Sequence, residues 1–258
     1  MHKKIRLNAA ATAGLLIILF FLIIAVFAPV IAPYDPKEMI ASYLPPSKEH
    51  ILGTNDVGQD IFSEMVYGTR VSLYIGIFAA FIVTGVGTVL ALVSGYFGGV
   101  ADKIITAITN IAMAVPSLPL TVLLIAYLNP GKWSLIIAIS ITAWTGTARI
   151  LRARVMQLKE LPFIKIEKTM GVHPAVILFK HILPNIKDII LTRGAMAISG
   201  AMMTEAGLSF LGLGEFGEKS WGSVLHYAFF RNSIMKKQYW WYVPPIVCIC
   251  VCVLGFML

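Results

Sequence analysis

Charged residues are scarce in this chain of 258 residues, where Asp, Glu, Lys and Arg together make up only 13%. Ordinary soluble domains carry about 25%. Hydrophobic residues reach 58%, the mean hydropathy is +0.81, and the apolar residues fall into blocks close to the roughly 20 residues that span a ~30 Å hydrocarbon core. The scarcity of charge therefore disfavours a water-soluble fold and predicts an integral membrane protein.

Cysteine and the common catalytic motifs are also nearly missing. The three cysteines, Cys248, Cys250 and Cys252, alternate within one apolar run, which is neither a disulfide framework nor a zinc-type pair of pairs, and we interpret them as small packing residues. No Gly-x-x-x-x-Gly-Lys-Ser/Thr phosphate loop and no His-Glu-x-x-His pattern occurs. We therefore expect a non-enzymatic chain without a metal site or bound cofactor, which does not hydrolyse ATP by itself.

The formal charge of +8 could indicate nucleic-acid binding, but in a membrane chain it more often reflects basic loops on the cytoplasmic side. A basic leader with Lys3, Lys4 and Arg6 precedes a first apolar block that is too long for a signal peptide. We interpret this block as an uncleaved span and place the N-terminus in the cytoplasm. Thirteen of the 21 Lys and Arg residues then fall in inner segments, as the positive-inside rule requires.

The apolar blocks predict an all-α polytopic protein with about six transmembrane helices. Pro116 and Pro119 should kink or interrupt the third span. We divide the chain into residues 1–70, a first helix followed by an irregular, proline-rich extracytoplasmic segment, and residues 71–258, a core that includes a cytoplasmic loop at 151–188. The predicted spans cover about residues 9–32, 71–97, 104–128, 133–150, 189–211 and 240–258.

The loop between the fourth and fifth spans has the punctuation of two short helices joined by a bend. Pro162 suits the first position of one helix and Gly171 the left-handed residue that closes it, while Pro174 can open a second helix that Pro184 ends. Helices this short need a partner surface. Apolar residues recur at helical spacing in both, at Phe163, Ile166, Met170, Val176, Phe179 and Leu183. Periodicity alone leaves open a basic amphipathic loop that lies on the membrane.

The run Glu167-Lys-Thr-Met-Gly171, followed by Ile182-Leu-Pro184, resembles the EAA loop of ABC importer permeases. The resemblance implies the type I ABC importer permease fold, with a coupling helix seated in a cleft of the ATPase subunit. Lys168 and Thr169 stand where the family commonly has alanines. The implied ATPase-coupling residues are Glu167, Met170, Gly171, His173 and Pro174.

Three further stretches are similar to permeases of the dipeptide, oligopeptide and nickel importer group. They are Leu52 to Ser63, Gly68 to Leu73 and Thr204 to Gly214, and the group usually has arginine where Gln59 stands. The resemblance implies an inner-membrane location and four kinds of partner: a second homologous permease, two ABC ATPase subunits that bind ATP and Mg, an extracytoplasmic substrate-binding protein and membrane lipid. It implies no nucleic-acid partner.

Glu205 is the only acidic residue within a predicted span, where a carboxylate is costly unless it faces protein or water. We name Glu205, Met202 and Ser209 as candidates for the translocation pathway. The alternative for Glu205 is a structural hydrogen bond to the partner permease or to a hydroxyl such as that of Thr204. Methionine in a span usually serves packing, so Met202 does not indicate a metal site.

The functional prediction is a permease subunit that forms, with its partner, a pathway for dipeptides, oligopeptides or nickel and metallophore-like cargo. A binding protein delivers the cargo, and the loop around Gly171 transmits ATPase closure to the spans. The alternative is an ion channel or passive pore. Such a protein would use the same apolar spans but would need no docking loop.

Overall fold

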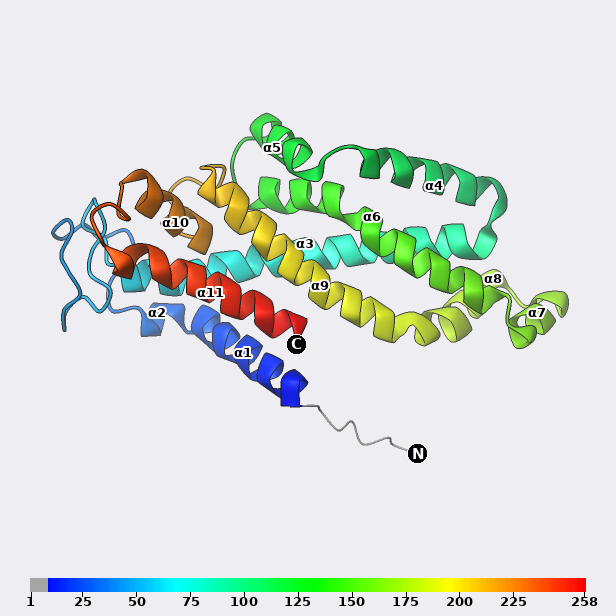
Figure 1. Ribbon diagram of the computed structural model, residues 1–258. Helices are drawn as coiled ribbons and strands as arrows, with labels where there is room; N and C mark the ends of the chain where they lie inside the picture. The colour runs from blue at the N-terminus through cyan, green and yellow to red at the C-terminus, as the bar shows by residue number, and fades with distance from the viewer. Residues whose placement is uncertain (1–8) are drawn as a thin grey trace. The chain divides into compact units, whose positions relative to one another are not determined.

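The computed structural model describes residues 9–258, where the regular structure is helical except for one isolated antiparallel bridge between Thr54 and Asp60. Figure 1 shows the order of the helices. The predicted all-α class is confirmed, whereas the basic leader with Lys3, Lys4 and Arg6 lies outside the described residues. The long helices are α1 (Ala9–Val26), α3 (Ile61–Phe97), α4 (Gly99–Ala114), α5 (Ser117–Leu128), α6 (Lys132–Lys159), α9 (Leu183–Phe210) and α11 (Tyr239–Met257), and the shorter ones are α2 (Ala28–Ile31), α7 (Pro162–Thr169), α8 (Pro174–Val176) and α10 (Trp221–Phe230).

Within residues 9–258, four helices are long and apolar enough to cross a membrane, namely α1, α3, α6 and α11. Helices α4 and α5 are separated by a short break with a 90° bend, and they add a fifth span if the bent pair is counted as one. Pro116 lies in the break between them, as expected of a residue that lacks a backbone N–H. The predicted fifth span lies within α9 except for its last residue, and α9 does not pass the same test. The total of six spans therefore stays a prediction.

Several helix boundaries differ from the sequence prediction. Helix α3 begins at Ile61, well before the predicted start at residue 71, because the carboxylate of Asp60 accepts the Ser63 N–H at 2.8 Å and caps the first turn. Helix α10 was not predicted. It is too short to span a bilayer, and it starts at a capping box in which Ser220 and Ser223 exchange hydrogen bonds.

The described residues form two compact units whose segments alternate along the chain. The first unit comprises the described part of Met1–Phe78 together with Leu124–Ile136 and Ile198–Leu258, and the second comprises Ala79–Leu123 and Ile137–Ala197. Helices α3, α5, α6 and α9 each contribute residues to both units. The expected division of the chain at residue 70 stays a prediction.

In the first unit, α11 packs against α1 and α10 (Figure 1). The core contains the rings of Trp221 and Trp241, and Phe21 meets Trp221 edge-on at 5.3 Å between ring centroids. Cys252 is buried in this core, whereas Cys250 is exposed and Cys248 is partly buried. All three thiols are free.

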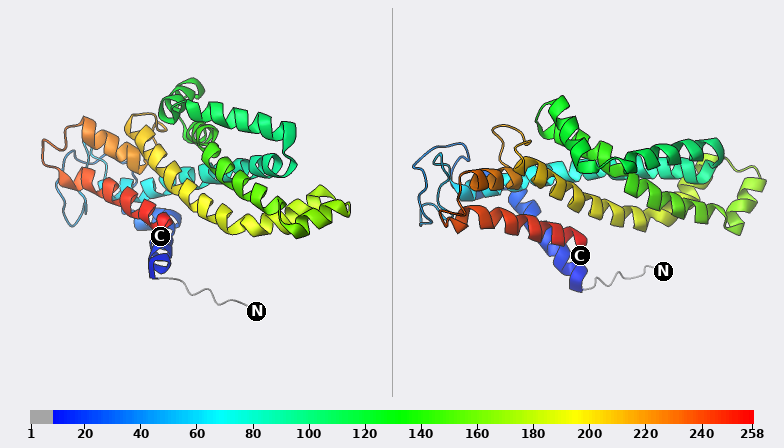
Figure 2. Two further views of the ribbon diagram at one scale, coloured as in Figure 1. Left: turned by 45° about the vertical axis from the view of Figure 1, so that its right-hand side comes forward. Right: turned by 45° about the horizontal axis from the view of Figure 1, so that its top comes forward.

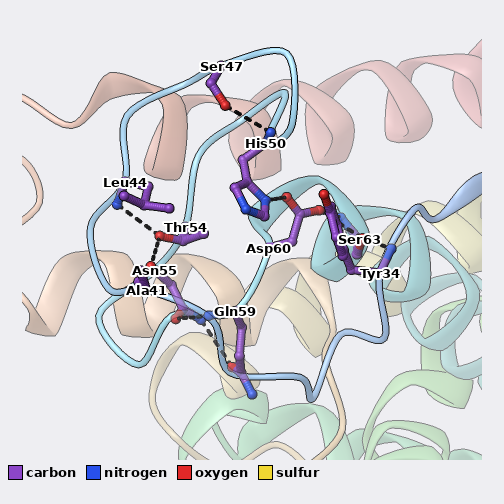
Figure 3. Close-up of polar contacts among 10 residues, drawn as sticks. All are labelled: Tyr34, Ala41, Leu44, Ser47, His50, Thr54, Asn55, Gln59, Asp60 and Ser63. Carbon is purple, nitrogen blue, oxygen red and sulfur yellow. Dashed lines mark hydrogen bonds and ion pairs between the residues drawn. The ribbon is translucent and has the colours of Figure 1, made fainter.

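Polar contacts within the chain hold the irregular segment before α3 in place (Figure 3). The buried His50 lies 3.0 Å from the carboxylate of Asp60, and the hydroxyl of Ser63 donates to the same carboxylate at 2.8 Å. The hydroxyl of Thr54 accepts the Leu44 N–H at 2.9 Å. These bonds satisfy buried polar groups that have no helix or sheet to pair with.

Candidate functional site

The bent loop, which we define as residues 161–182, begins with α7. Pro162 takes the first helical position, as predicted. At the other end, Gly171 has φ +77°, and two hydrogen bonds close the helix: Gly171 N–H to the Lys168 carbonyl at 3.2 Å and Val172 N–H to the Glu167 carbonyl at 3.0 Å. This pair of bonds is a Schellman motif, in which glycine is preferred because a Cβ is strained at positive φ.

The second arm of the bent loop also opens as predicted but ends differently. The His173 side chain caps α8 by accepting the Ala175 N–H at 3.3 Å, and Pro174 is the first helical residue. A π-helical turn, η1 (Ile177–Ile182), then runs directly into α9. The prediction that Pro184 ends this helix is wrong.

The π-helical turn gives the physical reason for this continuity. A proline inside an α-helix clashes with the carbonyl four residues before it and lacks the N–H to bond there. Here the Leu183 N–H reaches back to the carbonyl of Leu178, five residues earlier. The wider turn shifts the bonding register just before Pro184, so the helix absorbs the proline without stopping.

The bent loop buries one apolar face and exposes another. Ile164, Ile177 and Ile182 are buried in a core with residues of α6 and the start of α9. Six other apolar side chains of the loop are exposed, with Met170 at 77% and Phe179 at 67% exposure. We call the exposed set the apolar patch, and it comprises Leu161, Phe163, Ile166, Met170, Val176 and Phe179. Figure 2 shows the bent loop where α6 ends and α9 begins.

Glu167 ties the two arms of the bent loop together. Its Oε1 lies 2.9 Å from Nε2 of His181 in η1, and the ring of Phe163 packs edge-on against His181 at 6.0 Å. The other carboxylate oxygen of Glu167 is buried and has no hydrogen-bond partner among residues 9–258. Next to this tie, a hydrogen bond from Lys165 lowers the pKa of the exposed Glu160.

The five predicted coupling residues thus divide by what they contact. Glu167, Gly171, His173 and Pro174 shape the bend, whereas Met170 projects from it. No group of three or more His, Cys, Asp or Glu that could hold a metal ion occurs in the described part of the chain. The bent loop therefore presents an apolar surface that is supported by a buried core.

The predicted pathway residues lie in the first unit and are buried within it. Glu205 is fully buried, and its carboxylate accepts hydrogen bonds from Ser72 at 2.9 Å and Ser209 at 2.7 Å. The Ser72 oxygen in turn accepts the backbone N–H of Trp221 at 3.3 Å. Thr204 is not a partner of Glu205, because its hydroxyl donates to the Gly200 carbonyl.

Met202 and Ser209 are also almost fully buried, at 1% and 2% exposure. A Cβ on Gly76 would collide with the Met202 side chain, so the glycine lets α3 and α9 approach closely at this point. The contribution of Ser72 was missed at the sequence level. Ser72 lies in the stretch from Gly68 to Leu73, which resembles a family motif. The motif alone does not indicate that Ser72 is a partner of Glu205.

A buried charged cluster in the first unit was also missed. Nζ of Lys219 lies 2.6 Å from Glu64 and donates to Gln59 at 2.8 Å. The Asn55 amide donates to Glu64 at 2.9 Å. The permeases that this chain resembles usually have arginine where Gln59 stands. In this chain Lys219, which comes from a distant segment, supplies a cation next to Gln59.

Comparison with known families gives two matches. Residues 87–258 match the family described as "Binding-protein-dependent transport system inner membrane component". Residues 1–46 match the family described as "N-terminal TM domain of oligopeptide transport permease C".

Individual proteins are similar over most of the chain. The oligopeptide transport system permease protein OppC of Bacillus subtilis is 37% identical, over 98% of this chain and 83% of that protein. The dipeptide transport system permease protein DppC of the same organism is 34% identical, over 93% and 75% of the two chains. The glutathione transport system permease protein GsiD of Pectobacterium atrosepticum is 36% identical, over 88% and 76%.

Among solved structures, a chain of the inward-facing MetNI methionine ABC transporter is similar, with a TM-score of 0.58. The match covers 76% of this chain and 94% of that chain, at 18% identity. At this identity the likeness concerns the fold alone.

Proposed function

Since this chain belongs to the inner-membrane components of binding-protein-dependent transport systems, we propose that it forms, with a second homologous permease, the pathway through which an ATP-driven importer moves peptides. The chain is a multi-pass inner-membrane protein and a transport subunit, not a catalytic one. Its family implies ATPase and binding-protein partners. No cofactor is expected in this chain.

The cargo part of the proposal is a small peptide. It is supported by the oligopeptide, dipeptide and glutathione permeases that are similar over most of the chain, and it replaces the wider expectation that included nickel complexes. The proposed orientation, with the N-terminus and the bent loop in the cytoplasm, is supported by the excess of Lys and Arg in the inner segments.

The observation that carries the proposal is the apolar patch on the bent loop. Its six large apolar side chains are exposed on one short loop. Apolar surface left exposed in this way marks interaction sites, and burial of a large apolar side chain contributes about 1.5–3 kcal/mol. The buried core behind the patch fixes its shape before any partner binds. We propose that the patch docks into the ATPase subunit.

Transmission of movement follows from the continuity of η1 with α9. Because Pro184 does not break the helix, a displacement of the bent loop would be passed directly into α9. Rocking of packed helices between two arrangements would then alternate access to the pathway. Glu205, with Ser209 and Met202, would hold the helices that move, because its hydrogen bonds join α3 and α9.

Co-purification tests this proposal. Phe179→Asp places a charge in the apolar patch, and we expect it to reduce the ATPase recovered with the tagged chain by at least about tenfold, since the interface would have to bury a carboxylate. Phe216→Asp is the matched control, because Phe216 is also highly exposed, at 94%, and lies outside the patch. Undiminished recovery with Phe179→Asp, or no ATPase with the wild type, would reject the proposal, and the latter is the behaviour of a channel.

A further inference from the structure

The first unit contains a cavity of about 840 Å³. It lies between the early turns of α3, the start of α6, the segment after α9 and the residues near Asp35. Sites for small ligands usually measure about 300–1,000 Å³. Tyr67, Tyr74 and Trp133 supply aromatic surface to its wall, and the last two rings pack edge-on at 6.2 Å.

Two cationic side chains that line this cavity are unpaired in the described part of the chain. The guanidinium of Arg70 and the ammonium of Lys37 line it, and neither makes a hydrogen bond or ion pair with any residue in the described part of the chain. Arginine presents a planar fork of donors that matches a carboxylate. The cavity therefore has free capacity for an anionic group.

The same cavity has an excess of negative charge at another part of its wall. Glu215 and Glu218 share one cation, because the Lys132 ammonium lies 3.8 Å from the first and 3.4 Å from the second. Lys219 does not neutralise them, since it is bound to the buried Glu64. Of these two carboxylates, one charge is thus left for a positively charged group. The carboxylate of Asp35, which also lines the cavity, accepts only the backbone N–H of Lys37, at 2.8 Å, among residues 9–258.

We infer that this cavity binds the free termini of a small peptide, with the terminal carboxylate on Arg70 and the terminal ammonium at Glu215 and Glu218. The inference rests on the proposed function and adds a site and a chemical requirement to it. A simple anion would leave the shared carboxylates without a counter-charge, and a polyamine would leave Arg70 and Lys37 without one. A zwitterion with an apolar body satisfies both charged groups and the aromatic wall.

Photocrosslinking tests the site without the binding protein, which has its own specificity. The transporter is assembled from the full chain with its partner permease and ATPases, and is exposed to a tripeptide that carries p-benzoylphenylalanine and both free termini. We expect crosslinks at residues 67–74 or 131–133. We expect tri-alanine to compete, and its C-terminal amide to compete about 10- to 100-fold less well, the factor that corresponds to a charged hydrogen bond.

Variants of Arg70 then test whether this residue binds the terminal carboxylate of the peptide. Arg70→Gln should abolish the preference for the free carboxylate over the amide, whereas Arg70→Lys should retain part of it. Lys48→Gln is the matched control, because Lys48 is an exposed, unpaired cation of the same unit outside the cavity. Since Arg70 is exposed and its guanidinium makes no hydrogen bond or ion pair in the described part of the chain, its replacement should leave the fold intact. An unchanged preference in Arg70→Gln would overturn the inference.

Uptake by the complete transporter separates the two proposals. If vesicles with the binding protein import tri-alanine on ATP addition but the crosslinks map only outside the cavity, the site is refuted and the proposed function stands. If the wild type imports no peptide at all, both are refuted.

Discussion

Gly171→Val tests whether the shape of the bent loop, rather than its composition, couples ATP hydrolysis to transport. Gly171 has φ +77°, and apart from its own atoms and its two chain neighbours no atom lies within 4 Å of the position that a Cβ would occupy. A substitution there meets no steric neighbour, so its cost is backbone strain alone. For an L-residue in this conformation the strain is about 1–2 kcal/mol.

A strain of this size shifts the equilibrium between the native bend and its alternatives by a factor of about 5–30. Loss of the bend removes the two hydrogen bonds that close α7 and redirects Val172, which packs into the core behind the loop. We therefore expect Gly171→Val to insert normally but to import peptide at a fraction of the wild-type rate per ATP hydrolysed. Gly171→Asn should stay close to wild type, because asparagine tolerates this conformation.

The assay measures peptide uptake and phosphate release in the same vesicles, with binding protein present, so that the ratio reports coupling independently of the amount of transporter. We expect the ratio of peptide imported to phosphate released to be highest in the wild type and to fall in the order Gly171→Asn, Gly171→Ala and Gly171→Val. A wild-type ratio in Gly171→Val would refute the coupling role. Equal loss in the Asn and Val variants would show that the absence of a side chain matters, not the conformation.

Two further predictions concern the buried polar groups of the first unit. Glu205→Ala leaves the hydroxyls of Ser72 and Ser209 without their acceptor and should lower the unfolding free energy by about 1–3 kcal/mol, seen as a lower thermal midpoint of the purified chain, while Glu205→Gln keeps an acceptor and should cost less. Loss of uptake by Glu205→Ala at unchanged stability would instead favour a direct role in the pathway. Lys219→Ala leaves Glu64 buried and unpaired and should cost about 3–5 kcal/mol. Gln59→Arg should restore part of that loss by returning a cation to the cluster, and a double variant no more stable than Lys219→Ala would contradict this explanation.

The features that were predictable from the sequence have local causes. Pro116 interrupts the bent pair α4–α5, Pro162 and Pro174 each start a helix, and Gly171 closes one, because each depends on the backbone geometry of a single residue. The prediction that Pro184 ends a helix was wrong because it relied on the same kind of single-residue rule. A local rule cannot indicate that the preceding turn widens to a π-helix and carries the chain past the proline.

The missed features depend on partners that are remote in sequence. Lys219 and Gln59 are 160 residues apart, and Ser72 and Glu205 are 133 residues apart. No periodicity links such positions, so the sequence indicated that Glu205 needs a partner without identifying Ser72. Helix α10 was not predicted for another reason. Its ten residues are too few for a hydropathy pattern to distinguish it from a loop.

The candidate residues differ in whether their polar groups have hydrogen-bond or ion-pair partners within the chain, and this difference indicates different roles. A buried polar group that is satisfied within the chain has no need of a ligand or partner, and Glu205 and the pair of Glu64 with Lys219 are of this kind. Arg70 and the second oxygen of Glu167 are left without partners in the part of the chain that the structure describes. The exposed Met170 and Phe179 likewise keep apolar surface uncovered. The unpaired oxygen of Glu167 is buried and the apolar patch is uncovered, and both are costly unless something else meets them, so we expect the ATPase at the bent loop. Arg70 is exposed and its guanidinium is free to bind cargo, while Glu205 keeps the helices together as they move.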